Sequence, residues 1–161
     1  MQPDVTQRVG RALAWTGLAF VLAFALGAGS VVMFPKSPVT QLALFTLVTW
    51  AAIVVARPGW PALWRVLLAY GLAARIPVLI VMFLAIFQDW DSHYAKPRPD
   101  FPPMGHGGLF FWTAFLPQMS LWIFLTIAGG ILFGAIALGV RRLAGGDAGE
   151  GAPRAPASAG A

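Results

Sequence analysis

The stretch ALAWTGLAFVLAFALGAGSVVMF, residues 12–34, contains no charged side chain. As a helix rising 1.5 Å per residue it would cover about 34 Å, enough to cross a hydrocarbon layer of about 30 Å. Arg8 and Arg11 precede the run, so the segment also has the outline of a cleavable signal peptide. The apolar region of such a peptide is shorter, however. We therefore expect residues 12–34 to remain in the protein as a membrane-spanning helix.

The composition of the whole chain supports a membrane location. Of its 161 residues, 58% are hydrophobic and 11% charged, against roughly 25% charged residues in soluble domains. The formal net charge of +5 comes from basic residues scattered between apolar runs, which argues against nucleic acid as a partner. The chain contains no cysteine. This excludes disulfides, thiolate metal sites, thiol catalysis and CxxCH haem attachment. Arginine in preference to lysine, with abundant alanine and glycine, is associated with bacterial chains.

Three further apolar segments complete a set of four spans. We predict crossings at residues 12–34, 39–56, 66–87 and 117–140. Short proline-containing turns join the first three, because proline lacks an amide donor and ends the preceding helix. The predicted fold is an all-α integral membrane protein, with four transmembrane helices in an up-down bundle of two hairpins.

The membrane domain covers residues 12–143 in this scheme. Residues 1–11 form the N-terminus, and residues 144–161 form a tail rich in glycine, alanine and proline. The tail lacks the apolar periodicity that would offset the entropy of ordering it. We therefore expect it to be disordered.

The basic residues predict the orientation of the bundle. Lys36, Lys96 and Arg98 fall on one side, while the side of the N-terminus carries Arg8, Arg11, Arg57, Arg65, Arg141, Arg142 and Arg154. Because cytoplasmic loops carry the excess of lysine and arginine, we expect both termini in the cytoplasm of a bacterial inner membrane. The proline-rich loop 88–108 would then be extracytoplasmic.

Gly130 and Gly134 form a GxxxG pattern in the fourth span. Two missing side chains on one helix face allow a neighbouring helix to approach closely. The partner is either another span of the same chain or a helix of a homo-oligomer or a different membrane protein.

Arg75 lies inside the third span, where a charge costs between ~3 and ~15 kcal/mol. None of the spans contains an acidic residue. Two explanations remain open. Arg75 snorkels to the cytoplasmic phosphates, or it stays in the bundle, bound to carbonyls freed by Pro77, to Gln41 or Thr46, or to an anionic ligand or lipid.

The loop after the third span contains Asp89, Asp91 and His93, which are candidate ligands for a divalent cation. Ser92 lies between them, but a nucleophile needs geometric support that spacing does not show. His93 and His106 are also candidate axial haem ligands, but both lie in the proline-rich loop rather than facing each other across two helices. The loop prolines favour a different interpretation, in which an extended segment and its aromatic neighbours form a rigid cap at the outer end of the bundle.

No catalytic constellation follows from these patterns, and no cofactor is implied. The leading functional hypothesis is therefore a non-catalytic membrane component, an accessory or assembly subunit that presents helix faces and the outer cap to partners within the lipid bilayer. One alternative is a small transporter or lipid- or anion-binding carrier that uses Arg75. Another is a metal-dependent membrane enzyme that uses Asp89, Asp91 and His93.

Overall fold

The computed structural model describes residues 5–93, 96 and 101–145. In this part of the chain all regular structure is helical. Four of the helical segments are long and apolar enough to cross a membrane, namely Arg8–Met33, Pro38–Ala56, Pro61–Phe87 and His106–Ala144. This confirms the prediction of an all-helical chain with four apolar helices.

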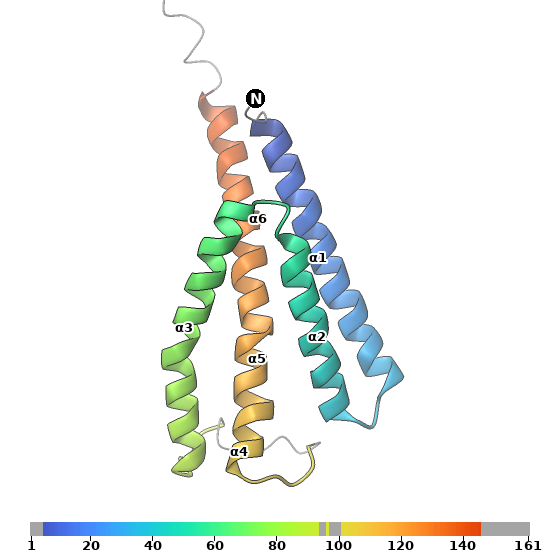
Figure 1. The fold of residues 1–161 in the computed structure, drawn as a ribbon, viewed down its shortest axis with the longest axis vertical. Helices are drawn as coiled ribbons and strands as arrows, with labels where there is room; N and C mark the ends of the chain where they lie inside the picture. The colour runs from blue at the N-terminus through green and yellow to red at the C-terminus, as the bar shows by residue number, and fades with distance from the viewer. Residues whose placement is uncertain (1–4, 94–95, 97–100, 146–161) are drawn as a thin grey trace, which may run out of the picture.

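Figure 1 shows the order of the elements and their arrangement. They are α1 Val5–Met33, α2 Pro38–Ala56, α3 Pro61–Phe87, α4 His106–Leu109, the π-helix η1 Phe110–Phe115, α5 Leu116–Met119 and α6 Leu121–Gly145. The last four elements follow one another as a single helical segment. The described chain begins and ends at the same end of the bundle.

Prolines mark the start of two of the long helices. Pro38 and Pro61 each occupy the first turn of their helix, α2 and α3, where the missing amide hydrogen would have no intrahelical partner. Before α2, the hydroxyls of Ser37 and Thr40 lie 2.7 Å apart. At the α2–α3 turn, the indole nitrogen of Trp64 donates to the Ile53 carbonyl at 2.8 Å, which ties the two helices together.

The α6 helix is the centre of the fold, because it packs against α1, α2 and α3. The core that surrounds it is rich in small residues and isoleucine: Ala12, Ala19, Ala23, Ala52, Ile53, Ala56, Ile123, Phe124, Ile127, Ala128, Ile131 and Ala135. Small side chains let helices approach closely, and close packing drives helix association where lipid and protein are equally apolar. A second cluster, at the end where α4 begins, joins Met82 and Ile86 to Leu109 and Ala114.

The last helical segment begins earlier in the chain than the fourth crossing that we predict from the sequence. We expected the crossing to start near Pro117, whereas the helical segment starts at His106. Pro117 lies just after the π-helix. A proline inside a helix removes one hydrogen bond and pushes against the carbonyl four residues earlier, here that of Thr113. The wider turn of the π-helix accommodates this proline without ending the helix.

Several sequence predictions concern residues outside the described ranges. The extended path through Pro97 and Pro99 is one of them, and the disordered tail is another, apart from its first two residues. Those two, Ala144 and Gly145, are the last residues of α6.

Candidate functional site

Arg75 belongs to the row of α3 residues that packs against α6. Each step of one turn forward along α3 is matched by a step of one turn backward along α6, because the two helices are antiparallel. The contacts are Leu63 with Gly134, Leu67 with Gly130, Gly71 with Thr126, and Arg75 with Trp122. Side chains four residues apart form such ridges on a helix. Arg75 therefore continues an apolar interface, and its charge is the exception in that interface.

The two glycines of the GxxxG pattern are covered by α3 of the same chain. A Cβ atom on Gly130 would lie 2.6 Å from both terminal methyl carbons of Leu67, and one on Gly134 would lie 3.1 Å from a methyl carbon of Leu63. Leucine side chains thus fill the space that the missing side chains leave. In contrast, a Cβ atom on Gly129 would meet no atom within 4 Å.

The guanidinium of Arg75 has two neutral partners. Its Nη1 donates to Oε1 of Gln118 on α5 at 3.3 Å, and its central carbon lies 5.6 Å from the centre of the Trp122 ring. The amide of Gln118 in turn faces the Met82 sulfur at 3.7 Å. A cation over an aromatic face is attracted by the electrons of the ring, so both contacts favour the charged side chain.

These partners leave most of the hydrogen-bonding capacity of Arg75 unused. A guanidinium has five N–H donors, and Nε of Arg75 is buried without a partner. Asp89 and Asp91 are the only acidic residues in the described part of the chain, and both follow the far end of α3. At helical rise Arg75 lies about 21 Å from the start of α3 and about 18 Å from its end. Among the described residues it is therefore a mid-helix cation without a neutralising carboxylate.

The sequence did not point to the residues that hold Arg75. Gln41 and Thr46 are candidate partners by sequence, but Nε2 of Gln41 donates to the Phe34 carbonyl at 2.7 Å, and the buried hydroxyl of Thr46 has no partner. The four-residue periodicity of Gly134, Gly130 and Thr126 was visible in the sequence. Its continuation by two more turns leads to Trp122 and Gln118, the two residues that contact Arg75.

The three candidate metal ligands lie at the other end of α3 and are engaged separately. A carboxylate oxygen of Asp89 lies 3.1 Å from Nε2 of His106. Asp91 instead forms an ion pair with Nζ of Lys96 at 2.7 Å. His93 is exposed. The described residues contain no group of three or more histidine, aspartate or glutamate side chains placed to hold a metal ion.

The pair of Asp89 and His106 joins the two ends of the loop. The His106 ring also lies 5.7 Å from that of Phe87, and the backbone of Asp89 has a φ of 50°. Two aromatic residues of the predicted cap differ in exposure. Phe101 is buried, whereas Trp90 is exposed and its indole nitrogen donates to the side-chain oxygen of Gln88 at 3.0 Å.

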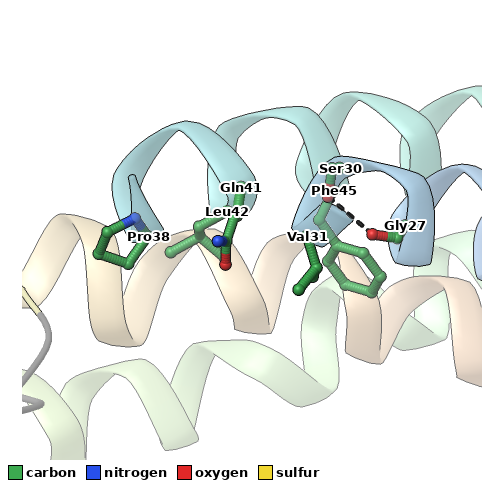
Figure 2. Close-up of a pocket in the computed structure, with 7 residues that line it drawn as sticks. All are labelled: Gly27, Ser30, Val31, Pro38, Gln41, Leu42 and Phe45. Carbon is green, nitrogen blue, oxygen red and sulfur yellow. Dashed lines mark hydrogen bonds between the residues drawn. The ribbon is translucent and has the colours of Figure 1, made fainter. Parts of the chain in front are cut away.

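A pocket of about 260 Å³ opens between α1 and α2 near their turn (Figure 2). Its lining includes Gly27, Ser30, Gln41 and Phe45. The Phe45 ring covers Gly27, where an added Cβ would lie 2.9 Å from a ring carbon, and the Ser30 hydroxyl donates to the Gly27 carbonyl at 2.7 Å. The Ser30 hydroxyl is already bonded, so the polar group of the lining with capacity left for a ligand is the amide of Gln41, which donates one bond to the Phe34 carbonyl.

Comparison with known proteins adds no functional assignment, because no family model, curated protein or solved structure matches this chain significantly.

Proposed function

We propose that the chain is a non-catalytic, multi-pass membrane protein that acts as an accessory or assembly subunit. In this proposal Arg75 pairs with a carboxylate carried by a helix of a partner protein. The observation that carries it is the mid-helix guanidinium of Arg75, held by the neutral Gln118 and the Trp122 ring with no acidic residue in any helix of the described chain.

The energetics of charges in lipid support a carboxylate partner. A charged residue inside a membrane usually pairs with another charge or lines a water-filled path. Gln118 and Trp122 orient the guanidinium but leave its net charge in place. A carboxylate on a neighbouring helix would neutralise that charge and accept its remaining donors in the forked geometry that arginine favours.

The surface of α3 supports the same proposal. Leu72, Ile76 and Phe83 are exposed, at 38%, 57% and 41%, and at 100° per residue all three lie on one flank of Arg75. On this flank α3 presents an apolar face that its own chain does not cover. The GxxxG face, by contrast, is occupied by Leu63 and Leu67. The uncovered face of α3 is therefore the better docking surface for a helix that carries an acidic residue.

The membrane arrangement belongs to the proposal as well. The four apolar helices cross the bacterial inner membrane as two hairpins, with both termini in the cytoplasm and the loop 88–108 outside. The support comes from the excess of basic residues at the end where α1 begins and from the preference of such residues for cytoplasmic loops.

Site-specific cross-linking tests the docking surface. A photoreactive amino acid at Ile76, one residue after Arg75 and 57% exposed, should cross-link to a discrete membrane protein in native membranes. The same probe at Phe133, which is 72% exposed on α6, is the matched control and should not. Introducing Arg75→Leu should abolish the Ile76 cross-link.

Two outcomes would count against the accessory-subunit proposal. A protein cross-link that persists unchanged with Arg75→Leu would show that the cation does not recruit the partner. A cross-link to lipid alone, lost with Arg75→Leu, would instead favour the lipid- or anion-binding carrier.

A further inference from the structure

Three arginines gather around one pocket at the end of the bundle where α1 begins. Arg8 and Arg11 come from the first turns of α1, and Arg65 comes from α3. Together with Trp60 and the turn before α3 they line a pocket of about 320 Å³. Because the three residues come from two helices far apart in the sequence, the fold assembles this cluster.

Close packing of the α2–α3 turn on α1 holds the arginines in place. A Cβ atom on the buried Gly59 would lie 3.3 Å from Cα of Ala12 and 3.3 Å from Cβ of Trp15. The turn therefore rests directly on α1, and α1 extends past it (Figure 1). This contact brings the first turn of α3 beside Arg8 and Arg11.

None of the three guanidinium groups has an ion pair or hydrogen bond within the described residues. All three side chains are exposed, and the acidic residues of the described chain, Asp89 and Asp91, lie beyond the other end of α3. Arg57 differs from them, because its guanidinium lies 5.8 Å from the centre of the Trp64 ring. Within the part of the chain that the structure describes, the pocket is therefore lined by three positive charges that no carboxylate neutralises.

The start of α3 adds a further attraction for anions. Pro61 and Ala62 line the pocket, and the N-cap residue Trp60 makes no side-chain capping bond. The first amides of a helix have no intrahelical acceptor, and the helix dipole makes this end positive. Phosphate groups commonly bind at such positions.

The surroundings of the pocket indicate which kind of phosphate-containing molecule it would bind. Trp15, Trp60 and Trp64 lie at this end of the bundle, and tryptophan prefers the headgroup level of a membrane. Exposed apolar residues such as Leu18 and Val66 continue from the pocket along α1 and α3. A ligand with a phosphate at the pocket and acyl chains along these helices satisfies both features.

We propose that Arg8, Arg11 and Arg65, with the N-terminus of α3, bind the phosphate of an anionic phospholipid headgroup. The site is separate from Arg75 and does not depend on the proposed partner. Basic pockets between helices recognise lipid headgroups in this manner.

Lipid titration of the purified full chain in a neutral detergent tests the site. Phosphatidylglycerol should raise the unfolding temperature, whereas phosphatidylcholine and inorganic phosphate at equal concentration should not. Arg11→Gln and Arg65→Gln should each raise the phosphatidylglycerol concentration needed for half of the effect about fivefold. Arg57→Gln, which removes the same charge from the same end of the bundle, should change that concentration less than twofold.

Arg65→Lys separates binding from folding, because it keeps the charge and should retain the phosphatidylglycerol effect to within about twofold. The proposal is overturned if phosphatidylglycerol has no effect, or if Arg57→Gln weakens the effect as much as Arg65→Gln does. An equal effect of inorganic phosphate would assign the pocket to free phosphate and overturn the lipid assignment.

Discussion

The guanidinium carbon of Arg75 lies 5.6 Å from the centre of the Trp122 ring, one helical turn beyond the contact of Gly71 with Thr126. The packing of α3 on α6 therefore continues without interruption into a charged position. An interface that otherwise consists of leucine, isoleucine, glycine and threonine residues needs no arginine for its stability. The charge is thus better explained by something that binds it than by the fold of the chain itself.

The bond between Arg75 and Gln118 should be measurable as a coupling. Gln118→Leu alone should lower the free energy of unfolding by about 1 kcal/mol, since it removes the acceptor of a part-buried hydrogen bond. The double variant Arg75→Met/Gln118→Leu should cost less than the sum of the two single variants, with a coupling of about 0.6 to 1.7 kcal/mol. A double-mutant cycle of unfolding in mixed micelles measures this, and strict additivity would show that the bond contributes nothing.

Two adjacent glycines provide a matched test of the α3–α6 interface. Gly130→Leu should lower the free energy of unfolding by about 1 to 3 kcal/mol, because the new side chain collides with Leu67. Gly129→Leu should be neutral or slightly stabilising, since it enters open space. Adding Leu67→Ala to Gly130→Leu should recover part of the loss. Equal destabilisation by the two glycine variants would argue against the described packing.

The loop after α3 contains a backbone conformation that restricts its sequence. Asp89 has a φ of 50°, a region that aspartate and asparagine tolerate but β-branched residues avoid. Asp89→Val should therefore destabilise the protein by about 1 to 2 kcal/mol, while Asp89→Asn should cost under about 1 kcal/mol, since the His106 pair is largely exposed. Thermal unfolding compares the two, and similar losses for both would contradict the backbone explanation.

The proposed orientation is tested by cysteine labelling, for which the native chain supplies no background thiol. Cysteines at Ser37 and Ser92 should react with an impermeant thiol reagent in intact spheroplasts, whereas one at Ser158 should react only after lysis. The reason is the excess of arginine on the side of the termini. Labelling of Ser158→Cys before lysis would reverse the orientation.

The sequence predicted the helices well because their limits depend on local chemistry. Uninterrupted apolar runs and the prolines at positions 38 and 61 were enough to predict four helices. The start of the last helical segment was harder to predict. Proline usually marks a first turn, yet Pro117 lies inside the segment because a π-helix precedes it.

The partners of Arg75 could not be predicted from composition alone. The cost of the charge identified the residue, but the choice among Gln41, Thr46 and Gln118 depends on the register between α3 and the segment before α6. That register is determined by the side chains that cover Gly130 and Gly134. The sequence showed those two glycines, but not which helix faces them.

A charge exchange tests the proposed ion pair between Arg75 and a carboxylate of a partner helix. The measurement is the amount of the partner, identified by cross-linking from Ile76, that co-purifies with the tagged chain from native membranes. Arg75→Asp should reduce the recovered partner at least tenfold, whereas Arg141→Asp, at an exposed position near the end of α6, should leave it unchanged.

Replacing the acidic residue of the partner helix by arginine should cause the same loss. Combining this change with Arg75→Asp should restore co-purification, because the ion pair is then re-formed with its charges reversed. Full recovery of the partner by the chain that carries Arg75→Asp alone would rule out this ion pair.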